Sequence, residues 1–153
     1  MRQSEREVRL LSDQMDILRR SPVLRLAMAD GGRPYVVPLS FGFEDGAIYF
    51  HCAREGLKMD ILRKNPAVCF EATAKAELRP GTAACRYSFS FESVIGQGRA
   101  VIMEDDAGRR KGLDAIMAHY GAPPPCEYDE KSLALTCVVK IEIESMTGKK
   151  SKA

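Results

Sequence analysis

The chain has 153 residues, 45% of them hydrophobic and 29% charged, which is the composition of an ordinary globular protein. Its 23 basic and 21 acidic residues nearly balance, and this argues against a nucleic-acid-binding surface, which needs a clustered excess of positive charge. No apolar run is long enough for a transmembrane helix, and the charged N-terminus leads into no apolar stretch of the secretory-signal type.

The first half of the chain predicts a helix, three strands and a second helix. In chain order they are expected at about 13–20 (capped by Ser12 or Asp13), at 23–28, 34–43 and 47–52, and at 55–64. Apolar residues recur at helical spacing in both helices and alternate along the second strand. Asp45-Gly46 predicts a tight hairpin turn. Each helix stops before a proline, because the residue that precedes proline avoids the helical conformation.

The second half predicts three more strands and a third helix. The strands are expected at 67–73, 85–102 and 135–143, and the helix at 106–120. The long middle strand is expected to bend at Gly96 and Gly98, because glycine in a strand often marks a bulge. Alternation along the last strand points five residues inward: Leu135, Cys137, Val139, Ile141 and Ile143.

Six strands joined mostly by hairpins, with about three short helices, predict a mainly β fold. We expect the antiparallel sheet to close into a small barrel, because closure removes exposed strand edges. The glycine motifs of dinucleotide-binding and P-loop folds are missing. We expect one domain over residues 1–153, in which residues 1–11 and 150–153 are flexible ends.

The cysteines indicate a reducing environment rather than a disulfide framework or a metal site. There are five, an odd number, and no two are spaced as CxxC: Cys52, Cys69, Cys85, Cys126 and Cys137. Zinc sites usually contain such pairs, so we expect no bound metal. Free thiols persist in a reducing compartment, which predicts a cytoplasmic location.

The first candidate binding segment is a strand stretch made of Val36, Val37, Pro38, Leu39 and Ser40. Proline has no backbone N–H to donate, so Pro38 indicates either an edge strand or an interruption of the strand. An interruption would leave backbone groups free to meet a planar heteroaromatic ligand. A plain edge-strand proline is the competing interpretation.

The second candidate segment, residues 51–58, joins the end of a strand to the start of a helix. A helix N-terminus presents free N–H groups and the positive end of its dipole, which suit a phosphate. Gly56 would let a ligand approach closely, and Lys58, helped by Arg54, would add positive charge. The competing interpretation is that both cationic side chains are simply solvated.

Ser93 is the third candidate, because it interrupts the apolar face of the long strand and a buried hydroxyl needs a hydrogen-bond partner. That partner is either a ligand or backbone. His51 is either a catalyst or a structural residue, and His119 is expected to be a charge partner for its helix end. Standard motifs such as GxSxG and HExxH are missing, so an enzyme of this sequence would depend on a cofactor.

Seven segments stand in an order and spacing that are specific as a set: 32–42, 48–53, 55–58, 65–70, 93–100, 113–121 and 147–149. Together they resemble the FMN-binding split-barrel family related to pyridoxamine 5'-phosphate oxidase. Within that family they are most similar to the 5-nitroimidazole-resistance (Nim-type) branch. The resemblance covers residues 12–149.

The resemblance implies a six-stranded split β-barrel that forms a homodimer, with FMN at the dimer interface. The implied cofactor-binding residues are Val36, Val37, Pro38, Leu39, Ser40, Phe50, His51, Cys52, Leu57, Lys58, Ser93 and Val94. Lys58, with Leu57 and the helix start, would hold the phosphate. Ser93 and Val94 would complete the site, from the same or the neighbouring subunit, and His51 is the implied catalytic residue.

The chain departs from the pyridoxamine-phosphate oxidases proper in two respects. Ser40 stands where those enzymes carry a basic residue, and their C-terminal aromatic and arginine substrate residues have no counterpart. Both departures argue against pyridoxamine 5'-phosphate as the substrate. Residues 73–89 match nothing in the family pattern.

The leading hypothesis is an FMN-dependent oxidoreductase that passes electrons from a reduced nicotinamide to a small acceptor such as a nitroaromatic or a quinone. His51 would position the acceptor or supply a proton near neutral pH. The alternative is a non-catalytic module that binds flavin or haem for storage or sensing, since a fold does not determine function. A third hypothesis is a cofactor-free interaction domain. None of them involves nucleic acid or a membrane.

Overall fold

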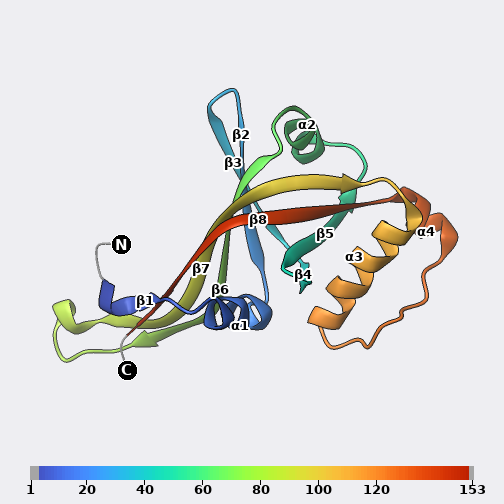
Figure 1. Cartoon of the computed structure of the whole chain (residues 1–153). Coiled ribbons are helices and arrows are strands. Elements are labelled where there is room, and N and C mark those ends of the chain that lie inside the picture. The colour runs from blue at the N-terminus through green and yellow to red at the C-terminus, as the bar shows by residue number, and fades with distance from the viewer. Residues whose placement is uncertain (1–3, 152–153) are drawn as a thin grey trace.

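The computed structural model describes residues 4–151, in which eight antiparallel strands form one sheet (Figure 1). The elements in chain order are a 3₁₀ turn (Ser4–Arg6), β1 (Glu7–Val8), α1 (Leu11–Arg20), β2 (Leu24–Asp30), β3 (Arg33–Leu39), β4 (Phe41–Glu44), β5 (Ala47–Ala53), α2 (Leu57–Lys64), β6 (Ala67–Arg79), a second 3₁₀ turn (Ala84–Arg86), β7 (Ser88–Met103), α3 (Asp106–His119), α4 (Glu130–Leu135) and β8 (Thr136–Lys150). In this part of the chain, no helix combines the length and hydropathy that crossing a bilayer requires.

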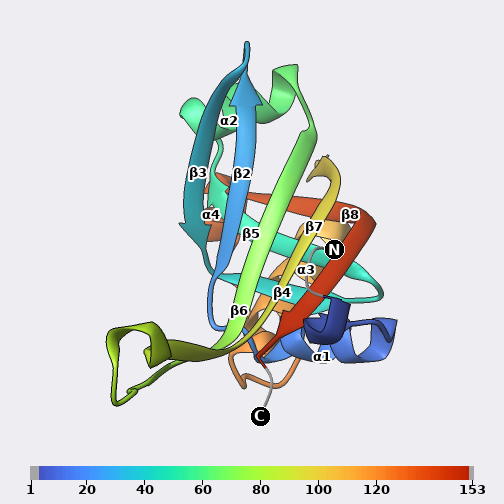
Figure 2. The same cartoon turned by 90° about the vertical axis from the view of Figure 1, so that its left-hand side faces the viewer.

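The sheet curls into a barrel that stays open on one side. Its strand order is β3-β2-β6-β7-β8-β5-β4, with β1 added to β8. β3 and β4 stand at opposite ends of this order, although only Ser40 separates them in the chain. The two ends of the sheet therefore come together at Ser40, yet within residues 4–151 no ladder joins β3 to β4. Figure 2 shows the result, a split barrel in which β2, β3 and β6 run across the direction of β4 and β5.

The mainly β fold with a split barrel is confirmed, but the predicted count of six strands is wrong. The expected strand 34–43 is two strands, because the chain leaves one sheet edge and joins the other at Ser40. The additional strand, β1, has only two residues and is too short to show a period in the sequence. The hairpin turn is confirmed, since Asp45 and Gly46 have φ values of +50° and +75°.

Two details of the helices also differ from expectation. The residue that precedes α1 is Leu10, which makes no side-chain cap, so the cap expected at Ser12 or Asp13 is wrong. The six-residue helix α4 was not expected, because it follows a proline-rich connector and shows no helical periodicity. Its last residue, Leu135, is 74% exposed, so the prediction that Leu135 faces inward on a strand is wrong as well.

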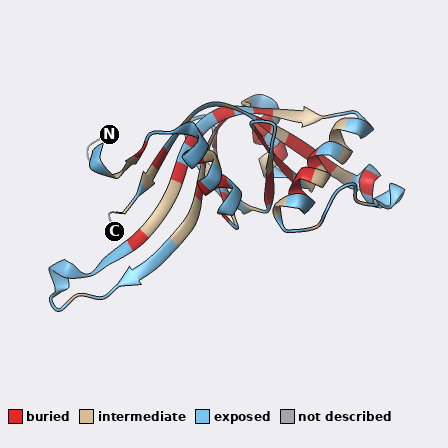
Figure 3. Ribbon diagram, turned by 60° about the horizontal axis from the view of Figure 1, so that its bottom comes forward, coloured by how far each residue is buried: buried red, intermediate tan, exposed pale blue. Residues whose placement is uncertain are grey.

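The main core fills the barrel and is built from alternate residues of the strands, as Figure 3 shows in red. Its largest side chains with no exposed surface are Phe41, Phe50 and Phe70. A smaller second core lies between the sheet and α3 and includes Tyr49, Ile116 and Val138. Because β5 sends alternate residues into both cores, it is covered on both faces over Ala47–Phe50.

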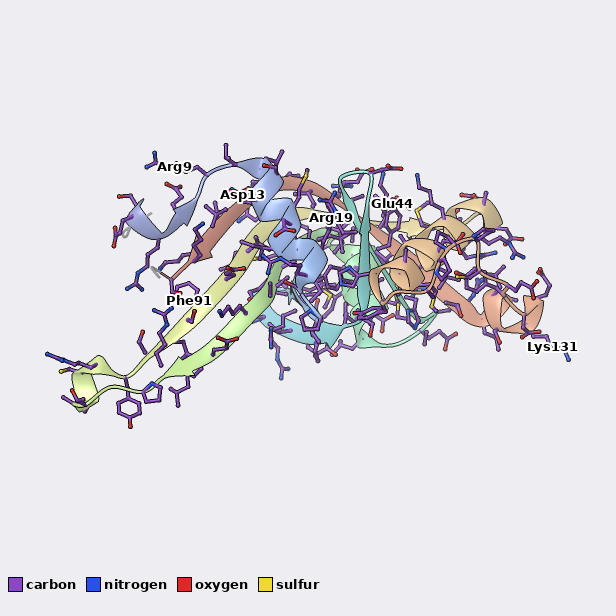
Figure 4. All side chains as sticks on the ribbon, turned by 90° about the horizontal axis from the view of Figure 1, so that it is seen from below. Arg9, Asp13, Arg19, Glu44, Phe91 and Lys131 are labelled. Atoms are coloured by element: carbon purple, nitrogen blue, oxygen red, sulfur yellow. The ribbon has the colours of Figure 1, made fainter. Side chains whose placement is uncertain are left out.

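Close approach of α3 to the barrel depends on a glycine in β4. A Cβ at Gly42 would collide with the backbone carbonyl of Ala115 in α3. On the other side of β4, Arg19 of α1 reaches toward the strand, and its guanidinium lies 5.1 Å from the Phe43 ring centroid (Figure 4). Two helices therefore hold β4, the short strand that ends the sheet.

The β6–β7 hairpin extends well beyond the barrel as an arm (Figures 1 and 2). Its strands pair as far as Arg79 and Ser88, so the expected strand 67–73 is too short and the expected start at Cys85 is too early. The pairing of β7 with β8 does shift register between Gln97 and Gly98, but the extra residue is Glu144 of β8, so the bulge lies in the partner strand rather than at the expected glycines of β7.

The N-terminal segment adds a two-residue strand to the sheet. Glu7 and Val8 pair with Lys149 and Gly148, and the Val8 side chain is buried. Glu7 and Val8 are thus part of the sheet, and the flexibility expected over 1–11 and 150–153 stays a prediction. Residues 1–3 and 152–153 lie outside the described residues.

The N-terminus of α3 offers a stability test. Asp105 is its N-cap residue, and the carboxylate accepts a hydrogen bond from the Gly108 backbone N–H at 2.7 Å. We expect Asp105→Ala to lower the free energy of unfolding by about 1 kcal/mol, measured by urea denaturation. Glu104→Ala is the matched control, because it removes the same charge one residue earlier without removing a cap. Equal losses in the two variants would contradict the capping role.

Candidate functional site

The start of α2 forms an open, positively charged corner. Gly56 is the N-cap residue with a φ of +117°, and a Cβ built there would meet nothing within 4 Å. No side chain caps the helix, whose first backbone hydrogen bond runs from the Asp60 N–H to the Gly56 carbonyl at 3.0 Å. The N–H groups of the first turn precede that bond and therefore face outward. Because a residue with positive φ cannot begin a helix, α2 starts at Leu57 rather than at the expected Glu55.

Lys58 lies in this first turn and leans over β5. Its ammonium is 5.4 Å from the centroid of the Phe50 ring, a cation–π arrangement that holds the side chain near the barrel wall. Phe50 itself has no exposed surface, so its ring supports Lys58 and any contact it makes with a ligand would be through the backbone. The structure thus brings two of the predicted site residues together.

The β3 segment divides its residues between two faces. Val37 and Leu39 are half-buried against the main core, whereas Val36, Pro38 and Ser40 are exposed. Pro38 stands opposite Arg25 on an edge strand, so the edge-strand interpretation of this proline is confirmed. The break in the strand follows at Ser40 instead.

His51 and Cys52 point to opposite faces of β5. Cys52 is half-buried on the side of the main core, and its sulfur lies 3.5 Å from the Met59 sulfur in α2. His51 is exposed on the other side, where it lines a cavity of about 320 Å³ between β5, α3 and α4. The other walls of this cavity include Met117 of α3 and Tyr128 of the connector.

Ser93 and Val94 lie apart from the other predicted residues within one chain. They belong to β7, and β2 and β6 stand between β7 and β3 in the sheet. Val94 is completely buried, whereas Ser93 is half-buried between its partners Thr73 and Lys149. A contribution of Ser93 to a site at Lys58 would therefore require a second chain.

Tyr128 was not among the predicted residues. Its hydroxyl donates a hydrogen bond to the Asp114 carboxylate at 2.7 Å, which ties the connector to α3. Burial and this hydrogen bond raise the pKa of the Tyr128 phenol, so it remains a protonated donor. Nothing in the sequence marks Tyr128, because the connector shows neither helical nor strand periodicity.

His119, the second histidine of the chain, is structural, since its Nε2 lies 2.8 Å from the Ser21 carbonyl oxygen.

Comparison with known protein families identifies the family that has this architecture. The family model for pyridoxamine 5'-phosphate oxidase matches residues 12–150. The chain belongs to the pyridoxamine 5'-phosphate oxidase-like family. The residues matched by this family include all eight strands except β1, together with all four α-helices but for the first residue of α1.

Solved structures with this fold include three of particular interest. A candidate 5-nitroimidazole antibiotic resistance protein from Bacteroides thetaiotaomicron is 30% identical, with a TM-score of 0.82, over 94% of this chain and 85% of that one. An FAD- and haem-binding protein from Mycobacterium smegmatis is 19% identical (TM-score 0.85, 97% and 74% covered). The flavocytochrome Anf3 of Azotobacter vinelandii is 20% identical (TM-score 0.83, 100% and 72% covered). The search of curated proteins gives no match.

Proposed function

We propose that the protein is an FMN-dependent oxidoreductase that passes electrons from a reduced nicotinamide to a small acceptor such as a nitroaromatic or a quinone. The observation that carries the proposal is the 30% identity to the candidate nitroimidazole-resistance protein over 94% of this chain. The same family membership and the free cysteines suit a protein of the cytoplasm.

The residues at the start of α2 fit the phosphate of FMN. Gly56 leaves space where any other residue would place a Cβ, and the first-turn N–H groups face outward. Lys58 adds a positive charge beside them. A phosphate gains both charge-assisted hydrogen bonds and the favourable end of the helix dipole in such a corner.

Exposed apolar side chains suit the ring system. Val36 on β3 is 56% exposed and Leu57 on α2 is 54% exposed, which is unusual for large aliphatic residues at the edge of a folded core. α2 packs against β2, the strand that pairs with β3, so both side chains belong to the same end of the barrel. A flat heteroaromatic ring packed on them would remove apolar surface from water.

A homodimer is part of the proposal. Two strands, β2 and β6, separate β3 from the strand that carries Ser93 in its own chain, so a single chain presents only part of the implied site. A second chain would bring its Ser93, together with the backbone of its buried Val94, to the ring and would cover Val36. Native mass spectrometry is expected to show two chains with two FMN molecules.

Different residues of the chain would bind the cofactor and act on the acceptor. Lys58 and the first turn of α2 hold the phosphate, and the apolar side chains exclude water from one face of the ring. His51 orients the acceptor from the wall of its cavity, or supplies a proton to it through the imidazole ring. A bound FMN supplies the reversible two-electron chemistry that these residues lack. Ser40, exposed and uncharged, gives no support for pyridoxamine 5'-phosphate as substrate.

Turnover measurements test this function. The protein loaded with FMN is mixed with NADH or NADPH and with a 5-nitroimidazole or a quinone, and nicotinamide oxidation is followed by absorbance. We expect acceptor-dependent oxidation that His51→Gln lowers at least about tenfold, a larger effect than on FMN affinity, to which His51 is also expected to contribute. Glu55→Gln, an exposed change in the nearby turn, is the control and should behave as the unmodified protein.

The visible absorption spectrum separates the alternatives. A flavin spectrum that bleaches with dithionite but no nicotinamide oxidation with any acceptor would favour the non-catalytic flavin-binding module. A haem spectrum would favour the haem-binding form of that alternative. A protein that stays colourless after incubation with FMN would overturn the proposal and leave a cofactor-free interaction domain.

A further inference from the structure

Two cysteines far apart in the sequence stand side by side in the sheet. Cys52 of β5 and Cys137 of β8 are direct partners in an antiparallel ladder. Direct partners have Cα atoms about 4.5–5.5 Å apart and side chains on the same face. Disulfides need Cα atoms about 4.4–6.8 Å apart, and the spacing that is general for direct ladder partners falls within this range. All five cysteines of the chain are unpaired thiols in this structure.

Cys137 opens onto a cavity with cationic walls. The cavity measures about 340 Å³, and three arginines line it together with the thiol: Arg54 after β5, Arg63 of α2 and Arg109 of α3. Glu104 is the only acidic residue in the lining. Cys137 itself is 6% exposed, so a reactant would reach its sulfur only from this cavity.

One arginine in the wall of this cavity has a buried nitrogen whose hydrogen-bonding capacity is unused within residues 4–151. Arg109 pairs with Asp106, but its Nε is buried and has no hydrogen-bond partner among residues 4–151. A buried donor without a partner is unfavourable, and an anionic ligand in the cavity would relieve this. Arg63 is held in place, because its Nη2 donates a hydrogen bond to the Arg54 carbonyl at 2.8 Å.

The two thiols are chemically unequal. The neighbouring Cys52 thiol lowers the pKa of Cys137 against the opposing effect of burial, and the three arginines lower it further. The neighbouring Cys137 thiol and burial raise the pKa of Cys52. Cys137 is therefore the more nucleophilic partner, because the thiolate and not the thiol attacks a disulfide.

We propose that Cys137 and Cys52 form a redox-active pair that reacts with a small anionic disulfide, of the glutathione disulfide type, bound in the arginine-lined cavity. Carboxylates of the disulfide would face Arg54, Arg63 and Arg109 and place its sulfur–sulfur bond at Cys137. The exchange chemistry requires no flavin, although Cys52 is also an implied cofactor-binding residue and Arg54 also a candidate partner of the phosphate.

The reaction takes two exchange steps. The Cys137 thiolate attacks one sulfur of the small disulfide, which forms a mixed disulfide and releases one small thiolate. Cys52 then attacks the Cys137 sulfur, which forms the Cys52–Cys137 disulfide and releases the second small thiolate. The proton that Cys52 loses goes to a released thiolate. Two protein thiols are oxidised by two electrons, and the small disulfide is reduced to two thiols.

Mass spectrometry of the full chain tests the pair. The reduced protein is treated with glutathione disulfide and then examined by intact mass and peptide mapping. We expect it to lose two hydrogens and to yield a linked peptide pair that contains Cys52 and Cys137. Cys52→Ser should instead keep one glutathionyl group on Cys137. Cys85→Ser, which removes an exposed thiol of the arm, is the control and should react as the unmodified protein.

The charge of the reactant tests the cavity. We expect glutathione disulfide to react about tenfold faster than the uncharged bis(2-hydroxyethyl) disulfide, because cationic walls concentrate anions. Arg54→Gln should remove most of this preference, whereas Arg33→Gln, at the exposed start of β3, should keep it. Equal rates for the two disulfides, or adducts confined to Cys85 and Cys126, would overturn the proposal. The linkage map and the rate comparison use the unmodified protein, so they decide the matter even if Cys52→Ser fails to fold.

Discussion

Phe70→Ala is expected to lower the free energy of unfolding by about 3–5 kcal/mol. Phe70 is on β6 near the middle of the sheet and has no exposed surface. It faces Gly96 across the ladder, and a Cβ at Gly96 would collide with the Phe70 ring. The ring therefore occupies the space that a side chain of β7 would otherwise fill. Its removal leaves a cavity that backbone on both sides prevents from closing.

Urea denaturation monitored by circular dichroism measures this loss. Phe89→Ala is the matched control, because Phe89 is 53% exposed on the arm, and we expect it to change stability by no more than about 0.5 kcal/mol. A domain of this size has only about 5–15 kcal/mol of stability, so Phe70→Ala is expected to unfold at much lower urea. Similar midpoints for the two variants would contradict the assignment of Phe70 to the core.

Lys58→Ala is expected to weaken FMN binding by about 10–100-fold. A hydrogen bond to a charged group contributes about 1.5–3 kcal/mol, and each 1.4 kcal/mol is about tenfold in affinity. The stability of the apoprotein should change little, because Lys58 makes one partly exposed cation–π contact with Phe50, of about 0.5–1 kcal/mol. The variant therefore separates ligand binding from folding.

Calorimetric titration with FMN and with riboflavin, which lacks the phosphate, checks this expectation. Riboflavin affinity should be the same in Lys58→Ala and in the unmodified protein. Lys64→Ala removes the same charge from the other end of α2 and should leave FMN affinity unchanged. An unaltered FMN dissociation constant in Lys58→Ala would show that the phosphate is bound elsewhere.

Local sequence patterns were sufficient to predict most helices, strands and turns, because the physical causes of these elements lie within a few neighbouring residues. Alternation along the part of 34–43 that forms β3 reflects the two faces of a strand, and Asn65-Pro66 stops α2 whatever surrounds it. The Asp45-Gly46 turn needs only positive φ at two neighbouring positions. The same local segments carried the family resemblance, which the match over residues 12–150 confirms.

Such local patterns could predict only part of the candidate site. The corner at Gly56 and Lys58 was predictable, since a glycine before a helix and a lysine in its first turn are neighbours in the chain. The role of Ser93 was not predictable, because the distance of Ser93 from the other site residues depends on which strands lie between β7 and β3. The position of His51 near the end of a strand could be predicted, but not the α3–α4 cavity that it lines.

By itself, then, the amino-acid order determined the strands, the main helices, the tight turns and the family of this protein. Tertiary structure alone decided that Ser40 joins the two ends of the sheet and that Cys52 meets Cys137. It also decided that arginines from three separate segments surround that pair. The physical reason is that strand order and helix docking depend on burying apolar faces contributed by distant segments, and no local period records which face will meet which.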